Sequence, residues 1–471
     1  MTNSECQGVG IVSSFFRHYG LVIRHCTEES PVARQTRTPI IIEDTHWPVQ
    51  IRLLAARLCV TKMAMKQIGR ALLWLTLSAP IFVSAQIDPI KRDLIQFGYN
   101  QAFEGHAPFV GYAFYYHNQP DFLRTNLTLR LALAPVYLDS EFGFVGGLGP
   151  HTDFAIGLAG GGFADSYNEI HGGTYYPSQS FEGSGGEISA SVYHLFNPGD
   201  LIPLNLILRG TAHYFTFDRS DSTASGFQLP EDRGEFSVRT GLRWGGIEPT
   251  LFPALAMELS VWYEGQLRTD SGPYGFFNGV SYDRSVEEQS HLFWAEAALS
   301  YTLPKSQQNF YVRLTGGTSV DADRFSAYRL GGYLPLVAEF PLSLPGYYFQ
   351  EISARQFVLF NANYLLPLDK NQRWNLGVNA SSAFVDYLPG EEQPGNWLSG
   401  VGGGILYRAP SDRFKIMLDY AYGIDAIRSH GRGANSIGVL MQWDLEKTRG
   451  GEGFHPAHPD RWRGWQWLLG D

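Results

Sequence analysis

Apolar and polar residues alternate with a period of two in one window after another along this chain. In the segment 257–268, Met257, Leu259 and Val261 alternate with Glu258 and Ser260. Runs of the same kind, many of about 9–12 residues, recur at 127–133, 293–302, 310–315, 414–422 and 436–445. Successive side chains of a strand point to opposite faces, so these runs predict strands with one apolar and one polar face. No convincing amphipathic helix interrupts them.

Two architectures use such strands. A soluble β-sandwich buries its apolar face and has strands that average about 5–6 residues. A transmembrane barrel turns its apolar face to lipid and needs about 9–11 residues per strand. The longer runs favour the barrel, and Arg130, Glu258, Glu264 and Arg268 all lie on polar faces. The sandwich, or another soluble β protein, is the alternative.

The count of runs sets the expected size of the barrel. Fourteen to sixteen runs can be assigned between residues 86 and 445, and no linker or shift in composition divides this region. An antiparallel transmembrane barrel of about 16 strands, in one domain, is therefore expected. The low charged fraction of 17% suits a surface that faces lipid.

A secretory signal is expected near the beginning of the chain. Lys66 and Arg70 precede an apolar stretch from 71 to 83, and small residues lead to a cleavage site between Ala85 and Gln86. The stretch is too short for a membrane span. We interpret residues 63–85 as the signal peptide and residues 1–62 as an upstream extension read from a wrongly assigned start. A genuine extension is the alternative.

The region from Gln86 onward excludes several classes of function. All three cysteines (Cys6, Cys26 and Cys59) precede it, which removes cysteine nucleophiles and cysteine-ligated metals. It carries 27 basic and 41 acidic residues, a net charge of −14, so it lacks the basic footprint of a nucleic-acid-binding protein. The acidic balance would weakly favour cations in an open lumen.

The last alternating run resembles the C-terminal signal that bacterial outer-membrane barrels present to their insertion machinery. The segment SIGVLMQW supplies the pattern through Ser436, Gly438, Met441 and Trp443. In barrels with this signal it ends the chain, whereas here 28 residues follow it. The tail 446–471 contains three tryptophans and is either a periplasmic or interfacial segment or a further error in the assigned reading frame.

Six segments between residues 310 and 445 follow one another as in bacterial surface antigen barrels: RLGGYLPL (329–336), LPGYYFQ (344–350), NANYLLPL (361–368), FVDYLPG (384–390), VGGGILYRAP (401–410) and IMLDYAYGI (416–424). These barrels form the C-terminal domain of the superfamily of BamA-type outer-membrane assembly factors and two-partner secretion transporters. The resemblance implies a 16-stranded barrel.

Two departures from the family pattern limit what the resemblance implies about function. Only Gln86 to about Glu104 precede the first convincing strand, which leaves no room for periplasmic polypeptide-binding repeats. The family's inward loop usually carries Arg-Gly-aromatic, with the Arg meeting an acidic residue. Here that stretch is Pro345-Gly346-Tyr347, and Asp386 matches the position of the acidic partner. A divergent, barrel-only member is expected.

Motifs for catalysis and cofactors are weak. The glycine-rich stretches lack a following helix, and the 13 histidines have no metal-ligand spacing, so no cofactor or metal is expected. A barrel lipase could combine His194 with Ser189 or Ser191, or use His213 beside Thr211. Asp139 and Glu141 more simply line a hydrated lumen than form a glycosidase pair.

The sequence thus predicts a non-enzymatic bacterial outer-membrane barrel with a structural, transport or membrane-assembly role. Its expected partners are outer-membrane lipid, the insertion machinery during biogenesis and a periplasmic protein, and nucleic acid is not among them. A passive, cation-preferring porin-like channel is the first alternative, and an outer-membrane lipase or esterase is the second.

Overall fold

The computed structural model describes residues 87–448, apart from 88, 89, 106, 108, 109, 164 and 201. The predicted upstream extension and signal peptide lie outside the described residues, as does the tail beyond residue 448. The first residues of that tail belong to α2 (Leu445–Thr448), a single helical turn. Among the described residues no helix is long and apolar enough to cross a membrane.

Sixteen long strands make up the wall: β1 (Arg92–Ala102), β2 (Val110–Gln119), β3 (Leu127–Leu133), β4 (Tyr137–Gly149), β5 (Thr152–Gly161), β8 (Glu182–Leu195), β9 (Leu204–Asp218), β11 (Arg233–Gly246), β12 (Leu255–Arg268), β15 (Gln289–Thr302), β16 (Asn309–Val320), β18 (Ile352–Pro367), β19 (Trp374–Tyr387), β20 (Trp397–Arg408), β21 (Phe414–Arg428) and β22 (Gly431–Asp444). The connections contain β6 (Ile170–His171), β7 (Thr174–Tyr175), β10 (Phe227–Gln228), β13 (Pro273–Phe277), β14 (Tyr282–Ser285) and β17 (Tyr328–Leu330), with 3-10 turns at Pro177–Gln179 and Pro410–Asp412.

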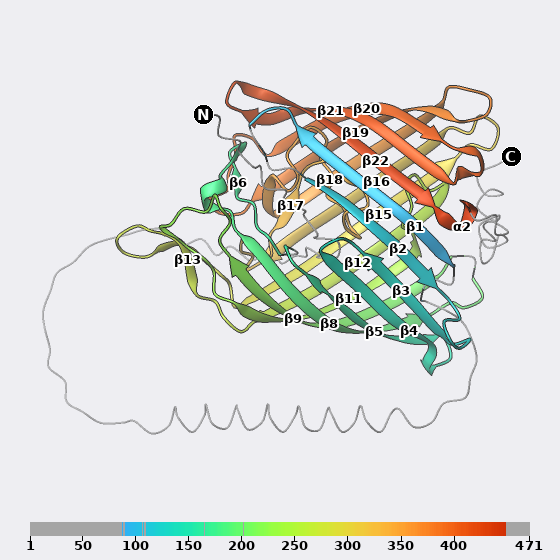
Figure 1. Ribbon diagram of the computed structural model, residues 1–471, viewed down its shortest axis with the longest axis horizontal. Helices are drawn as coiled ribbons and strands as arrows, with labels where there is room; N and C mark the ends of the chain where they lie inside the picture. Colours follow the sequence, from blue (N-terminus) through green and yellow to red (C-terminus); the bar gives the residue numbers. More distant parts are fainter. Residues whose placement is uncertain are drawn as a thin grey trace, which may run out of the picture. The chain divides into compact units, whose positions relative to one another are not determined.

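Each long strand pairs antiparallel with the next, and the first pairs with the last. The pairing of β1 with β22 runs from Leu94 opposite Asp444 to Ala102 opposite Ser436. Figure 1 shows these two strands side by side, with β2 on the other side of β1. The sheet is therefore a closed 16-stranded antiparallel barrel, which confirms the predicted fold class. Closure leaves no open strand edge, as lipid requires.

The two faces of the wall have the predicted polarity. On β12, Leu259 and Val261 are 44% and 53% exposed, whereas Glu258 and Glu264 are 4% and 5% exposed. The same alternation runs through β15, β16, β21 and β22. Apolar side chains thus point outward and polar ones point into the barrel. A soluble sandwich would bury the apolar face instead, so the barrel is the correct alternative.

The expectation that the first strand follows Glu104 is wrong. Residues Arg92–Ala102 already form β1. Gln96 and Asn100 of β1 are buried inside the barrel, and Ile95 and Phe97 alternate with them. The apolar side chain of Leu94 also points inward, into a cluster that other parts of the chain provide. That inward leucine masks the alternation in the sequence.

The two ends of the barrel differ in their connections. At one end, which we call the turn end, β1 begins and β22 ends, and the connections are mostly short, such as 150–151, 303–308 and 368–373. At the other end, which we call the loop end, several connections are long, namely 162–181, 219–232, 269–288 and 321–351. Outer-membrane barrels have short periplasmic turns and longer extracellular loops.

Candidate functional site

The inner wall carries many charged side chains, and several of the described acids there face arginines, although the buried Asp419 of β21 does not. The closest contacts are Arg130–Asp139 (2.9 Å), Arg209–Glu141 (2.8 Å), Arg239–Glu264 (2.7 Å) and Arg268–Glu235 (2.9 Å). Each pair joins strands that lie close together in the wall. Pairing offsets the cost of removing both charges from water. The carboxylates of these four pairs are therefore neutralised by arginines, although the sequence as a whole is acidic.

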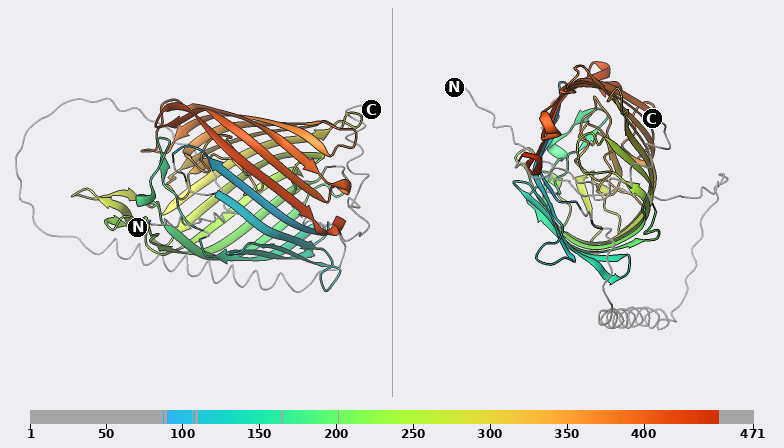
Figure 2. Two further views of the ribbon diagram at one scale, coloured as in Figure 1. Left: turned by 45° about the horizontal axis from the view of Figure 1, so that its top comes forward. Right: turned by 90° about the vertical axis from the view of Figure 1, so that its right-hand side faces the viewer.

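The connection 321–351, which we call the inward loop, folds into the barrel and meets these charges. Glu339 of the loop forms an ion pair with Arg243 of β11 and lies 3.6 Å from Nη1 of Arg239. Next to it, the ring of Phe340 packs edge-on against Trp262 and Trp294, with centroids 5.4 and 5.3 Å apart. The end-on view in Figure 2 shows loop segments inside the bore. The inward loop thus occupies the lumen and is bound to its wall.

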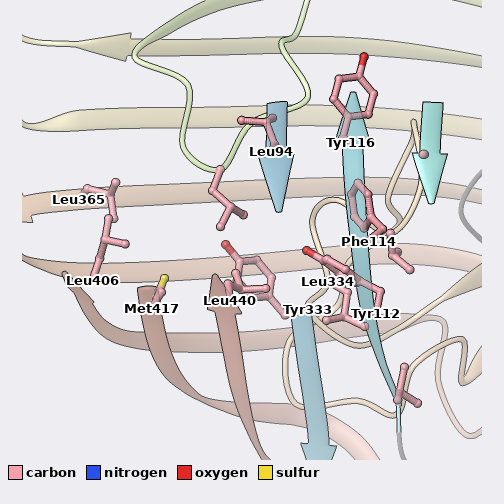
Figure 3. Close-up of a cluster of buried hydrophobic side chains, with 14 residues drawn as sticks. Leu94, Tyr112, Phe114, Tyr116, Tyr333, Leu334, Leu365, Leu406, Met417 and Leu440 are labelled. Carbon is pink, nitrogen blue, oxygen red and sulfur yellow. The ribbon is translucent and has the colours of Figure 1, made fainter. Parts of the chain in front are cut away.

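Deeper in the lumen the inward loop joins an apolar cluster. Tyr333, Leu334 and Val337 of the loop pack with inward-facing residues of seven strands, among them Leu94 and Leu440 (Figure 3). The Tyr333 hydroxyl donates a hydrogen bond to Oδ1 of Asn363 on β18 (3.0 Å). Because β1 and β22 both contribute to the cluster, the loop is packed behind the closing strand pair.

The tip of the inward loop is the stretch Pro345-Gly346-Tyr347, which lies against β20 and β21. A Cβ atom on Gly400 would sit 2.1 Å from the carbonyl oxygen of Pro345, and one on Gly346 would sit 1.9 Å from the backbone nitrogen of Gly423. Gly346 also has a φ of 83°, which favours glycine. The glycines on both sides therefore let the loop tip and the wall meet backbone to backbone.

Asp386 does not face this tip. It has the same parity as Phe384 on β19, points outward, and forms an ion pair with Arg355 of β18 (2.7 Å). The position expected for the acidic partner is therefore on the outer face. The buried ion pair at the inward loop is instead Glu351 with Arg428 of β21, at 2.9 and 3.0 Å, and Arg428 also stacks on Tyr348. The sequence analysis missed this pair, and an arginine after the apolar run 416–424 was its only signal.

The turn between β11 and β12, residues 247–254, reaches across the barrel at the turn end. The backbone N–H of Leu251 donates to Oε1 of Gln442 on β22 (2.8 Å), and the Leu251 carbonyl accepts from Nζ of Lys415 on β21 (2.9 Å). Gln96 of β1 donates both to the carbonyl of Pro249 (2.9 Å) and to Gln442 (3.0 Å). We call residues 247–254 the clasp turn, because they hold the two closing strands from the opposite wall.

The four residues of the expected C-terminal signal all lie in β22. Ser436 and Gly438 face inward, and Met441 and Trp443 face outward. Ser436 pairs in register with Ala102 of β1 and Ala421 of β21, so this strand is paired on both sides. At its loop end, Asn435 donates two hydrogen bonds to Glu104, at 3.0 and 2.7 Å. A role in targeting stays a prediction.

At the loop end, four charged residues from different connections form what we call the cap cluster. Glu169 lies 3.3 Å from both Arg284 and Arg324, and Arg324 also forms an ion pair with Glu391. Burial raises the pKa of Glu391 to about 7, and the negative charge of Glu169 adds to the rise while Arg324 opposes it. The cluster ties the connections 162–181, 269–288, 321–351 and 388–396 together.

The histidine and serine side chains considered for a hydrolase contact other residues and not one another. Nδ1 of His194 contacts Thr152 Oγ1 (2.8 Å), and Ser191 accepts a hydrogen bond from Arg209. The two ring nitrogens of His213 face Asp165 (3.1 Å) and Glu187 (3.3 Å).

The remaining candidate groups have ordinary surroundings. Ser189 lies next to the backbone of Gly157, and Thr211 is part of the β9 ladder. Asp139 and Glu141 flank Arg130. Within the described residues, no group of three or more acidic, histidine or cysteine side chains could hold a metal.

Comparison with known proteins gives distant structural likenesses. No family model and no curated protein matches the chain. CdiB from Acinetobacter baumannii is 9% identical, with a TM-score of 0.47 over 75% of this chain and 60% of that chain. BamA from Haemophilus ducreyi lacking POTRA domains 1-3 is 10% identical, with a TM-score of 0.46 over 81% and 78%. CdiB from Escherichia coli is 11% identical, with a TM-score of 0.47 over 75% and 63%.

The chain thus spans about 60% of the length of the Acinetobacter CdiB chain that it matches. The strand pairing forms the 16-stranded barrel that the resemblance of residues 310–445 implies.

Proposed function

We propose that this protein is an integral outer-membrane β-barrel that its own inward loop keeps closed at rest, and that it acts in transport or membrane assembly without catalysing a reaction. The observation that carries the proposal is the double anchoring of the inward loop. Glu339 binds the wall at β11, and Glu351 binds it at β21. A loop that two ion pairs fix to different parts of the wall, one of them (Glu351–Arg428) fully buried, acts as a plug.

Placement in the outer membrane is supported by the wall itself. Most strands are long enough for the roughly 9–11 residues of a membrane-spanning strand, and their outward side chains are apolar. By the usual arrangement, the turn end is periplasmic and the loop end is extracellular. Cleavage of residues 63–85 and recognition of the Ser436–Trp443 strand by the insertion machinery belong to the same proposal.

The first alternative is a passive, cation-preferring channel. It would need an unobstructed lumen with unpaired acidic side chains, whereas Glu264 and Glu141 face arginines and the inward loop fills the bore. Planar-bilayer recording distinguishes the two. The closed barrel shows no steady conductance at low voltage, and a steady cation-selective current in the purified wild type would contradict the proposal.

Outer-membrane insertion has its own test. A closed barrel resists detergent until heated, so unboiled protein from the outer-membrane fraction should migrate faster on a gel than boiled protein. A soluble periplasmic product, or migration independent of heating, would overturn the proposed membrane location.

The absence of catalysis is tested directly. Both nitrogens of His213 face carboxylates, which leaves neither positioned to take a proton from a hydroxyl. We expect no hydrolysis of phospholipids or chromogenic esters. Hydrolysis that disappears on Ser191→Ala would instead establish the lipase alternative.

The proposal also includes a periplasmic protein that works together with the barrel. Affinity purification after reversible cross-linking in cells should recover such a protein with the barrel. Its recovery with the wild type, and not with an unrelated barrel of the same membrane, would identify it as specific.

A further inference from the structure

A groove of about 900 Å³ crosses the outer face of the barrel over β11, β12, β15, β16, β18 and β19. Its volume lies in the range of about 300–1,000 Å³ typical of sites for small ligands. Most of its lining residues face the lipid side of the wall, and the inward-facing Trp262, Trp294 and Phe357 line its floor.

The groove follows one line of cross-strand neighbours. Leu242, Val261, Ala295, Gly316, Val358 and Phe384 face outward and are paired in register, each with the next across six successive strands. The line begins on β11 four residues from the turn end of that strand and ends three residues from the end of β19 at the loop end. The groove therefore climbs obliquely through the apolar belt toward the loop end.

Small residues make the line concave. Ala295 and Gly316 are direct neighbours in the middle of the line, between the larger outward side chains of Val261 and Val358. The outward ring of Phe293, two residues from Ala295 on β15, borders the groove on one side. Leu314, two residues from Gly316 on β16, borders it on the other side. Lipid tails are as apolar as leucine, so shape and close packing, rather than hydrophobicity, decide what is held on such a surface. A trench of this form suits a linear hydrocarbon chain.

Polar groups gather where the groove approaches the loop end. In the neighbouring row, Thr318, Gln356 and Asp386 face outward and are paired in register. Arg355, 48% exposed, donates to both carboxylate oxygens of Asp386, at 2.7 and 3.3 Å. Guanidinium, amide and carboxylate groups together offer donors for a phosphate and acceptors for sugar hydroxyls.

We propose that this groove binds one acyl chain of an outer-leaflet glycolipid, with the phosphorylated sugar headgroup against Arg355, Gln356 and Asp386. The glycolipid is the occupant because the polar groups lie at the loop end, which faces outward in the arrangement proposed above. Asp386 supports the same choice, because its carboxylate can accept hydrogen bonds from several sugar hydroxyls of such a headgroup.

The chain offers a matched pair of variants for the test. Ala295→Leu fills the trench, and Ala297→Leu adds the same side chain two residues along the same outward face of β15, outside the groove. Gly316→Leu fills the trench from β16, where the nearest atoms to a new Cβ are at 3.7 and 3.8 Å, an ordinary contact distance. Gln356→Ala removes part of the headgroup site while leaving the trench open.

Full-length protein is extracted from outer membranes in mild detergent and washed, and the lipid that it retains is identified and quantified by native mass spectrometry. We expect the wild type and Ala297→Leu to retain about one glycolipid per barrel, and Ala295→Leu and Gly316→Leu to retain at least fivefold less. Gln356→Ala should give an intermediate loss. Heat-modifiable migration of each variant confirms that it is a folded barrel.

The outcomes separate the possible occupants. Retention of phosphatidylethanolamine in place of glycolipid would overturn the proposed headgroup, and equal retention by Ala295→Leu and Ala297→Leu would overturn the site. A wild type that migrates as a folded barrel but retains no lipid would also overturn this inference, while leaving the proposed plugged barrel intact.

Discussion

Leu251 and Gln442 are joined by a hydrogen bond of 2.8 Å although they come from opposite sides of the wall. Leu251 follows β11, the eighth of the sixteen long strands, and Gln442 lies on β22, the last. Through this contact the clasp turn spans the turn end and binds the strand pair that closes the barrel. Gln442 also accepts from Gln96 of β1, so one side chain serves the clasp turn and both closing strands.

Gln442→Ala should therefore loosen the closing pair. The substitution leaves the buried N–H of Leu251 and the amide of Gln96 without this acceptor, which we expect to cost about 1–3 kcal/mol of unfolding free energy. Urea unfolding in lipid vesicles measures the loss. Gln101→Ala is the control, since the Gln101 side chain donates only to the neighbouring Ala102 carbonyl in the described contacts. Equal losses in the two variants would show that the clasp turn contributes nothing.

Glu339→Ala should weaken the plug. Without the carboxylate, Arg243 and Arg239 keep only their partners on the wall, Glu258 and Glu264. We expect transient conductance steps in planar bilayers, at least ten times more frequent than in the wild type. Glu231→Ala, which removes a carboxylate from an exposed connection at the loop end, should behave like the wild type. A silent Glu339→Ala barrel would mean that packing alone holds the loop.

Gly400→Ala should displace the tip of the inward loop. The added Cβ would lie 2.1 Å from the Pro345 carbonyl oxygen, so the backbones must separate, at a cost of about 1–3 kcal/mol. Faster cleavage of the loop by an added protease, compared with the wild type, reports the displacement. Gly210→Ala on β9 is the matched control, because a Cβ there meets nothing within 4 Å. Identical cleavage of both variants would argue against a tight tip.

Stability of the cap cluster should depend on the charge of Glu391. Burial raises its pKa from the ordinary value of 4.5 to about 7, so the folded state binds a proton more tightly than the unfolded state between these pH values. Stability contributed by Glu391 is therefore full below pH 4.5 and falls as pH rises through 7, by at most about 3 kcal/mol.

Glu391→Gln isolates this contribution, since it keeps the shape of the side chain and removes the titration. We expect the unfolding free energy of the variant, relative to the wild type, to increase between pH 5 and pH 8. Unfolding in vesicles at both pH values measures the difference. A difference that does not change with pH would show that Glu391 titrates normally.

The faces of the strands could be predicted because alternation is a local property. The inward position of Glu258 and the outward position of Leu259 follow from their parity alone. The same rule would have placed Asp386 correctly, since it shares the parity of the outward-facing Phe384. The resemblance to a family motif pointed the other way, and the alternation within the chain was the better guide.

The plug and the clasp could not be predicted because their contacts are long-range. Glu339 stands alone in an apolar stretch, and nothing near it in the sequence indicates that Arg243, almost one hundred residues earlier, is its partner. Long-range contacts also explain why β1 was not predicted. Leu94 breaks the alternation of this strand because its side chain packs inward against Tyr333 and Leu334 of the inward loop. Local patterns therefore predict the strands of the wall, whereas the contacts of the loop and the turn inside the barrel become known only from the folded structure.

The pairing of β1 with β22 also constrains the order of folding. The contacts that close the barrel join residues far apart in the chain, by 331 positions between Glu104 and Asn435 and by 346 between Gln96 and Gln442. Contacts between distant residues carry a large loop-closure entropy and form slowly. Until the last strand has been synthesised and exported, β1 has an unpaired edge that can join another chain. The time between export and closure is therefore the period in which this protein is most exposed to aggregation.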